Sequence, residues 1–143
     1  MPKQFIIAGI GTEIGKTVCS AIVTKALQAD YWKPVQAGNV TDGDAYWVQQ
    51  WVPGTQIFPS TYALNHPLSP HTAAELDGVS IEIGAFFLPE TTNNLVVELA
   101  GGIMVPLNNE QTNLDLIQHL GLPVILVSKN YLGSINHTLL TYE

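Results

Sequence analysis

The sequence predicts an α/β domain with a parallel sheet flanked by helices. Three observations predict it: apolar runs of strand length recur along the chain, segments with helical spacing alternate with these runs, and a glycine-rich loop joins the first run to the first helical segment. Runs that are apolar at every position are typical of strands in a sheet covered by helices. The chain has 143 residues, of which 46% are hydrophobic, so we expect a single domain over residues 1–143.

The first half is expected to open with a strand, a loop and a helix, which is the start of a β-α-β unit. Its helical segment carries apolar residues at a helical spacing, Val18 and Ile22 among them. Pro34 is expected to end the second strand, because proline cannot donate to a sheet. We expect strands at residues 5–8 and 30–35, loops at 9–17 and 36–43, and helices at 17–27 and 44–51.

The second half contains two further apolar runs that predict strands. Residues 53–70 are rich in Pro, Ser, Thr and Asn and are expected to be irregular. Because ligands bind at the carboxyl ends of parallel strands, we expect the glycine loop, Lys33, Glu98 and Lys129 near one edge of the sheet. We expect strands at residues 94–98 and 123–128, a turn at 100–102, helices at 71–76, 113–120 and 133–141, and a weak helix at 81–88.

Residues 9–17, with the sequence GIGTEIGKT, are the strongest functional signal. Glycines let a backbone curl and aim several N–H groups at one anion, beside a helix N-terminus. Lys16 can reach the β- and γ-phosphates of a nucleoside triphosphate, and the Thr17 hydroxyl can bind Mg²⁺. The strict motif has its first glycine where this chain has Ile10, so the spacing is a variant. The alternative is a plain glycine-rich turn with an exposed lysine.

Three more side chains are candidates for the same site. Glu98 ends an apolar strand, where a carboxylate can complete a Mg²⁺ shell or simply face solvent. Asp44 begins an expected helix, so the residues alone favour a helix N-cap over a metal ligand, and Asp42 competes for either role. Lys33 can neutralise an anionic substrate or a phosphoryl group in transfer, or it can be a solvated lysine.

The charge balance excludes several classes of partner. The net charge is −7, with 12 acidic residues against 5 basic ones, so no basic stripe exists for nucleic acid or for anionic membranes. The single cysteine, Cys19, permits no internal disulfide and no cysteine-based zinc site. We see no signal peptide and no apolar stretch of about 20 residues, so we expect a cytoplasmic protein. His71 is either a base or a helix-start residue, and the other histidines are expected to be structural.

The assembled motifs resemble those of the dethiobiotin synthetase family. The resemblance implies a phosphate-loop NTPase-like fold and an ATP- and Mg²⁺-dependent cyclo-ligase of biotin biosynthesis, acting as a homodimer. Such enzymes join 7,8-diaminopelargonate to CO₂ through a carbamate and a carbamic–phosphoric anhydride. The matching segments, in the family's order, are residues 9–17, 31–38 (YWKPVQAG), 68–73 (LSPHTA), 96–106 (VVELAGGIMVP) and 123–141 (PVILVSKNYLGSINHTLLT).

The resemblance also implies roles for individual residues. The implied nucleotide-binding residues are Gly11, Thr12, Glu13, Ile14, Gly15, Lys16, Thr17, Glu98, Gly101 and Gly102. The implied Mg²⁺ ligands are Thr17, Asp44 and Glu98. The implied catalytic groups are Lys33, Lys16 and Thr12. The implied substrate-binding residues are Lys33, Ala37, Ser134, Ile135 and Asn136, the last three beside the diamine's carboxylate at a subunit interface.

Three features depart from the family's pattern. Leu99 stands where the family usually has glycine, and we expect it to crowd the turn near the phosphates. Ala37 stands where members often offer a hydroxyl, so we expect one substrate contact to be absent. Family members also run well beyond residue 143 and read the nucleotide base there, which leaves a shortened, non-catalytic nucleotide-binding or assembly module as the alternative function. A relative of the cobyrinate amidotransferases is a weaker option, because the chain has no room for a glutaminase domain.

Overall fold

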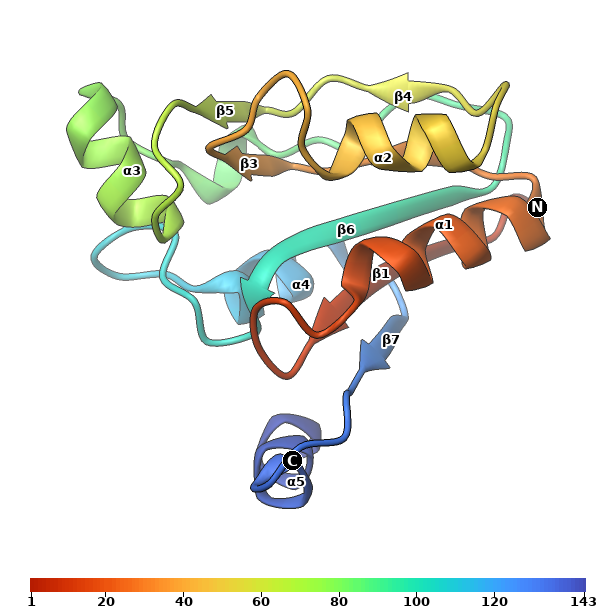
Figure 1. Cartoon of the computed structure of the whole chain (residues 1–143). Helices are drawn as coiled ribbons and strands as arrows, with labels where there is room; N and C mark the ends of the chain where they lie inside the picture. Colours follow the sequence, from red (N-terminus) through yellow and green to blue (C-terminus); the bar gives the residue numbers. More distant parts are fainter.

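The centre of the molecule is a five-stranded, all-parallel sheet, seen in a computed structural model that describes residues 1–143 (Figure 1). In spatial order its strands are β4, β2, β6, β1 and β7, at Ile57–Phe58, Asp30–Trp32, Leu95–Gly102, Gln4–Gly9 and Val124–Val127. A second, two-stranded parallel sheet pairs β3 (Val35–Ala37) with β5 (Tyr62–Leu64). The predicted α/β class with a parallel sheet is therefore confirmed.

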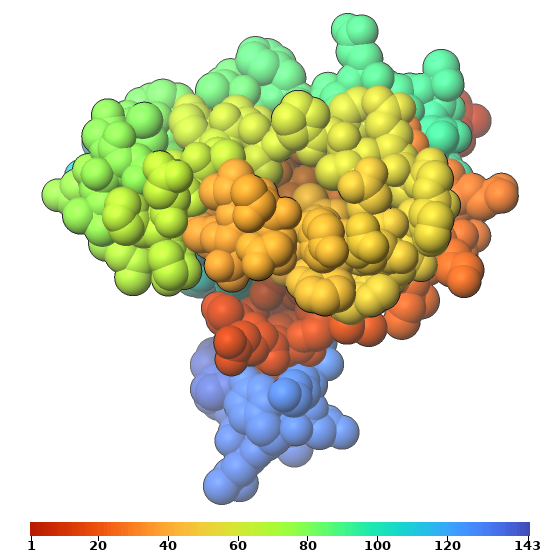
Figure 2. Space-filling model, turned by 45° about the horizontal axis from the view of Figure 1, so that its top comes forward, coloured from red at the N-terminus to blue at the C-terminus, as the bar shows by residue number.

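Five helices and one 3₁₀ turn complete the chain. They are α1 (Lys16–Leu27), α2 (Asp44–Trp51), α3 (Pro70–Asp77), η1 (Ile83–Ala85), α4 (Asn113–Leu120) and α5 (Ser134–Tyr142). None of these helices is long and apolar enough to cross a membrane. Figures 1 and 2 show α5 projecting beyond β7, away from the rest of the molecule.

The core lies on both faces of the large sheet, because successive side chains of a strand point to opposite faces. On one face, Ile7 and Val96 pack with Ala21 of α1 and Val48 of α2. On the other face, the larger cluster includes alternate residues of β1 and β6 together with Leu116 of α4. Burial on both faces explains why β1 and the first part of β6 are recognisable as apolar runs. Strand β7 lies at the sheet edge and is only partly buried, although its sequence is equally apolar.

The face of helix α1 that packs against the sheet is not the face predicted from its apolar residues. Val18 and Ile22 are exposed, whereas Ser20, Ala21 and Thr24 are buried. The rotation of this helix is fixed at its start, where Lys16 and Thr17 must follow the glycine loop directly. Small residues then allow α1 to lie close against β1 and β6.

The predicted second strand, residues 30–35, is two strands in the structure. Strand β2 pairs with β4 and β6 in the large sheet, and β3 begins after Lys33 and Pro34 and pairs with β5 instead. The prediction that residues 53–70 are irregular is wrong where β4 and β5 lie. Strands of two and three residues are too short to show a period in the sequence.

The remaining differences concern ends of elements. The predicted turn at residues 100–102 is instead the last part of β6, and the weak helix over 81–88 is reduced to η1. The helices predicted at residues 44–51 and 113–120 are confirmed with the same bounds. For α4 the cap explains this agreement, because Thr112 and Asp115 form a reciprocal capping box and Gly121 ends the helix in the left-handed region.

Candidate nucleotide and metal site

The glycine loop lies between the end of β1 and the first turn of α1, at the carboxyl edge of the sheet. Gly15 precedes the helix with a φ of 99°, a left-handed conformation that glycine adopts without steric cost. The Lys16 ammonium reaches back over the loop and donates to the Gly11 carbonyl at 2.7 Å. N–H groups at the start of a twelve-residue helix, beside a lysine, are suited to binding an anion.

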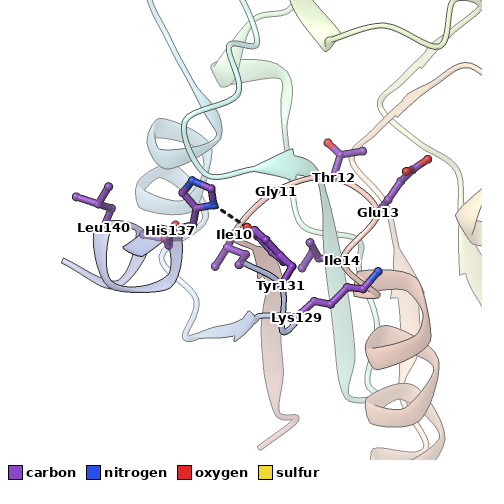
Figure 3. A pocket seen from close by; sticks show the side chains of 10 residues that line it. Ile10, Gly11, Thr12, Glu13, Ile14, Lys129, Tyr131, His137 and Leu140 are labelled. Atoms are coloured by element: carbon purple, nitrogen blue, oxygen red, sulfur yellow. Dashed lines mark hydrogen bonds between the residues drawn. The ribbon is translucent and has the colours of Figure 1, made fainter. Parts of the chain in front are cut away.

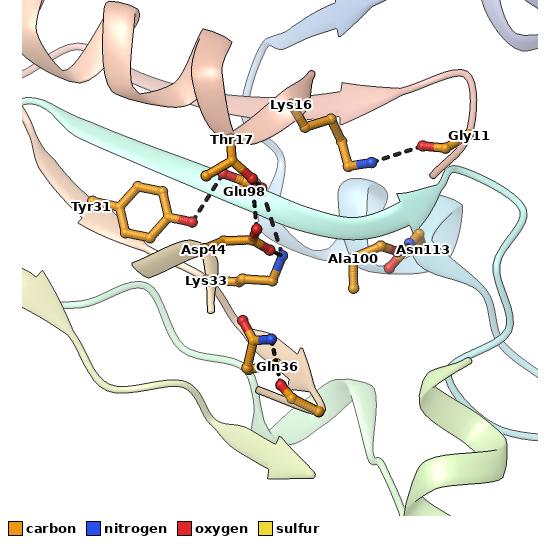
Figure 4. A network of polar contacts seen from close by, with 11 residues as sticks. Gly11, Lys16, Thr17, Tyr31, Lys33, Gln36, Asp44, Glu98, Ala100 and Asn113 are labelled. Atoms are coloured by element: carbon orange, nitrogen blue, oxygen red, sulfur yellow. Dashed lines mark hydrogen bonds and ion pairs between the residues drawn. The ribbon is translucent and has the colours of Figure 1, made fainter. Parts of the chain in front are cut away.

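Three oxygen-bearing side chains from three elements meet next to this loop (Figure 4). The Thr17 hydroxyl of α1 lies 2.7 Å from Asp44 Oδ1 of α2 and 3.0 Å from Glu98 Oε1 of β6. Two carboxylates and a hydroxyl are hard oxygen ligands of the kind that Mg²⁺ takes beside nucleotide phosphates. The donor set therefore fits Mg²⁺, and the structure brings together the three residues that the family resemblance implied as its ligands.

The interpretation of Asp44 as a helix N-cap is wrong. Gly43 is the N-cap residue of α2, and Asp44 is the first helical residue, with its carboxylate directed at Thr17 and Lys33. A side chain at position 43 would meet the Asn39 carbonyl at 2.6 Å from its Cβ, so glycine is required there. Asp42 is exposed and is not part of this cluster.

Lys33 is a buried ion-pair partner, so its interpretation as a solvated lysine is wrong. It lies where β2 ends and is only 5% exposed. Its ammonium forms an ion pair with Asp44 Oδ2 and lies 3.6 Å from Glu98 Oε1. The break between β2 and β3 thus places a positive charge directly beside the two carboxylates.

Burial and neighbouring charges shift the pKa of three groups at this site. Burial alone would raise the pKa of Asp44, but the charge and hydrogen bond of Lys33 outweigh it and hold that pKa below its usual range. Burial lowers the pKa of Lys16, and the neighbouring Lys33 charge lowers it further. Burial also raises the pKa of Tyr31 well above its usual value, as does the Glu98 charge, so the phenol remains protonated.

A cavity of about 740 Å³ opens over this cluster. The sequence-predicted residues that line it are Thr12, Glu13, Gly15, Lys16, Thr17, Lys33, Ala37, Asp44, Glu98 and Gly101. Ala37 faces the cavity without a hydroxyl. Gln36, Asn39 and Ser69 also line it and were not predicted. Only their closeness to Lys33 and Pro70 in the sequence could have indicated them.

Several predicted residues do not reach this cavity. Ile14 turns its side chain into the core, so only its backbone can contact a phosphate. Gly102 lies beside Gly11 instead of on the cavity wall. Ser134, Ile135 and Asn136 are at the start of α5 and do not line the cavity within this chain.

A second cavity, of about 600 Å³, lies on the other side of the glycine loop (Figure 3). Its walls come from the loop, from α5, and from the segment between β7 and α5, which contributes Lys129 and Tyr131. The Tyr131 hydroxyl lies 2.7 Å from His137 Nδ1 across this cavity. Thr12 and Glu13 line both cavities, so the loop separates two hollows at the same sheet edge.

The expectation that Leu99 crowds the phosphate site is wrong. Glu98 points toward Thr17, and the next residue of a strand must point to the opposite face. Leu99 is accordingly buried in the larger core cluster with Leu107 and Leu116. Its side chain stabilises the far side of the sheet and leaves the phosphate side free.

His71 lies in the first turn of α3 and is not a lining residue of either cavity. Its ring contacts the Ser69 hydroxyl at 2.8 Å and the Thr72 hydroxyl at 3.2 Å. These contacts agree with the helix-start alternative.

Comparison with known proteins agrees with this geometry. Residues 3–143 match a family model described as an AAA domain. The whole chain is 54% identical to the ATP-dependent dethiobiotin synthetase of Christiangramia forsetii and covers 70% of that relative. Over 99% of its length the chain is 51% identical to the enzyme of the same name from Cytophaga hutchinsonii and covers 69% of that relative. It is also 46% identical over 99% of its length to the enzyme of that name from Chlamydia pneumoniae, of which it covers 64%. This chain therefore spans about two thirds of these relatives' length, and it belongs to the dethiobiotin synthetase family.

Proposed function

We propose that this chain catalyses the ATP- and Mg²⁺-dependent formation of dethiobiotin from 7,8-diaminopelargonate and CO₂ in the cytoplasm. One observation carries the proposal: Lys16, Thr17, Lys33, Asp44 and Glu98 converge at one cavity beside a glycine loop. A phosphoryl transfer to an anionic acceptor needs such an arrangement of cations, oxygen ligands and N–H groups.

The reaction has three steps that balance in atoms and charge. An amine of the diamine adds to CO₂, releases a proton and forms a carbamate. A carbamate oxygen attacks the γ-phosphorus of ATP, so ADP leaves and a carbamic–phosphoric anhydride forms. The second amine then attacks the carbonyl carbon, the ring of the cyclic urea closes, and phosphate and a proton leave.

The loop and Lys16 would bind the triphosphate. Lys16 already lies over the loop with its ammonium on the Gly11 carbonyl, and it needs only to turn toward phosphate oxygens. Thr17, Asp44 and Glu98 would hold Mg²⁺, which neutralises charge on the phosphates when it is bound.

Lys33 would exchange partners during the reaction. Its ammonium pairs with Asp44 and lies near Glu98. With Mg²⁺ held by Asp44 and Glu98, the Lys33 ammonium would be free to pair with the carbamate and the phosphoryl group. Because negative charge accumulates on both of these groups, a buried ammonium at this position lowers the barrier.

The diamine's carboxylate would bind at the start of α5 in a homodimer. Ser134, Ile135 and Asn136 form the first turn of that helix, where N–H groups favour an anion. The Ser134 N–H donates to the Tyr131 carbonyl at 3.0 Å, so the N–H groups of Ile135 and Asn136 would make the contact. These residues do not line the 740 Å³ cavity of their own chain. Binding there would therefore use the helix of a second copy.

A product assay tests the proposal. The purified chain is mixed with ATP, Mg²⁺, bicarbonate and 7,8-diaminopelargonate, and dethiobiotin is measured by mass spectrometry, with Lys16→Ala as the control. Product that disappears in the control is expected. ATP-dependent thermal stabilisation with no product and no effect of the diamine would instead favour the nucleotide-binding module.

A further inference from the structure

We propose that Tyr31 is a positioning residue that holds the Glu98 carboxylate in the orientation needed to bind Mg²⁺. This role rests on the metal site of the proposed function. Tyr31 does not line either cavity. Its effect would pass entirely through Glu98.

The backbone places the two side chains together. Tyr31 of β2 is paired with Val96 of β6, two residues before Glu98, and residues two apart on a strand share a face. The Tyr31 hydroxyl donates to Glu98 Oε2 at 2.9 Å (Figure 4). Tyr31 is 0% exposed and Glu98 is 1% exposed, so water does not compete for this bond.

The two oxygens of Glu98 have different partners. Oε2 accepts from Tyr31, while Oε1 lies 3.0 Å from the Thr17 hydroxyl and 3.6 Å from the Lys33 ammonium. The Tyr31 bond therefore fixes the rotation of the carboxylate and turns Oε1 toward the position shared with Asp44. Hydrogen-bond partners of metal-binding carboxylates commonly set ligand orientation in this way.

A purely structural role for Tyr31 makes a different prediction. The phenol ring packs with Ile7, Val96 and Val48 in the core, and phenylalanine would keep that packing. Only the hydroxyl touches Glu98. Tyr31→Phe therefore separates the packing of the ring from its action on the carboxylate.

The test measures metal binding without turnover. Mn²⁺ is titrated into the full chain with saturating ADP, and free Mn²⁺ is read by electron paramagnetic resonance. Tyr31→Phe is expected to weaken Mn²⁺ binding roughly 10-fold or more, and to raise the Mg²⁺ concentration for half-maximal activity in parallel. ADP affinity without metal is expected to stay unchanged.

Tyr62→Phe is the matched control. Its hydroxyl also makes one hydrogen bond, accepting from the Glu82 N–H at 3.1 Å, but it lies away from the carboxylates. This variant is expected to bind Mn²⁺ as the wild type does. In a Glu98→Gln background, Tyr31→Phe is expected to have no further effect on Mn²⁺, because both changes act through one carboxylate.

Three outcomes would overturn the inference: unchanged Mn²⁺ binding in Tyr31→Phe, an equal loss in Tyr62→Phe, or an unfolded Tyr31→Phe, since a hydroxyl that only orients a carboxylate is not required for folding. The readout is independent of the proposed reaction. A wild-type chain that makes no dethiobiotin, but whose Mn²⁺ binding falls in Tyr31→Phe, would refute the proposed function and leave the role of Tyr31 standing.

Discussion

Lys33 shows how burial decides what a charged side chain can do. At the end of a strand, a lysine could equally face solvent or a ligand, and the sequence alone did not separate these roles. The structure encloses its ammonium beside Asp44 and Glu98. Removing an ammonium from such a cluster leaves two neighbouring carboxylates that a bound cation or a proton must neutralise.

Lys33→Met is therefore expected to separate chemistry from metal binding. The kcat for dethiobiotin formation should fall roughly 10²- to 10³-fold, because a charge that stabilises the transition state is lost. The Mg²⁺ concentration for half-maximal activity should not rise, because the ammonium that competes for Asp44 is gone. Steady-state kinetics at varied Mg²⁺ checks both, and a kcat within a few-fold of wild type would contradict the role of Lys33.

Asp44 is expected to contribute to acid sensitivity. Its folded-state pKa lies below its ordinary value, so the ionised carboxylate stabilises the fold at pH above about 4 and that stabilisation is lost as the pH falls through the folded pKa. Carboxylates titrate between roughly pH 5 and pH 3. Over this range the melting temperature of Asp44→Asn should fall less than that of the wild type. Thermal unfolding at several pH values measures this, and parallel slopes would refute it.

At the scale of elements, long apolar strands and capped helices could be predicted from the sequence. Strands β1, β6 and β7 lie where their apolar runs indicate, and α4 begins at its capping box. Strands β4 and β5 could not be predicted, because their pairing depends on partners distant in sequence. The face of α1 also escaped prediction, since the glycine loop and not hydrophobicity sets its rotation.

The same division applies to the site. The loop residues were predictable, because backbone N–H groups and glycine conformations follow from a local motif. The contact of Asp44 with Thr17 and the contact of Tyr31 with Glu98 were not predictable. The partners lie 27 and 67 positions apart in the sequence. Only the folded sheet brings those segments together.

Gly15→Ala tests whether the loop's left-handed conformation serves the nucleotide. No atom lies within 4 Å of a Cβ at this position, so the cost is conformational, about 1–2 kcal/mol of stability. Gly54→Ala is the matched control, with a φ of 89° and equally open surroundings. Urea unfolding should show similar losses, whereas ATP binding by calorimetry should weaken only in Gly15→Ala. Equal ATP affinity in the two variants would disprove a specific role for the loop conformation.

At the scale of the whole molecule, α5 differs from the other helices. It projects beyond β7 (Figure 1). It also carries exposed apolar residues along its length. Ile135, Leu139 and Tyr142 follow the spacing that places residues on one face of a helix. Apolar side chains grouped in this way are typical of protein–protein contact surfaces, which supports the proposed homodimer.

Ile135→Glu combined with Leu139→Glu is expected to separate that dimer into monomers. Ile135 is 78% exposed in the single chain, so the charges cost only a small i, i+4 repulsion in the monomer but would be buried without partners in the dimer. Sedimentation should shift from dimer to monomer, ATP binding should persist, and dethiobiotin formation should fall because α5 of the second copy no longer meets the diamine. Phe87→Glu, at a side chain 76% exposed on another part of the surface, is the control and should remain dimeric and active. A wild-type chain that sediments as a monomer yet makes dethiobiotin would show that the diamine's carboxylate is bound within one chain.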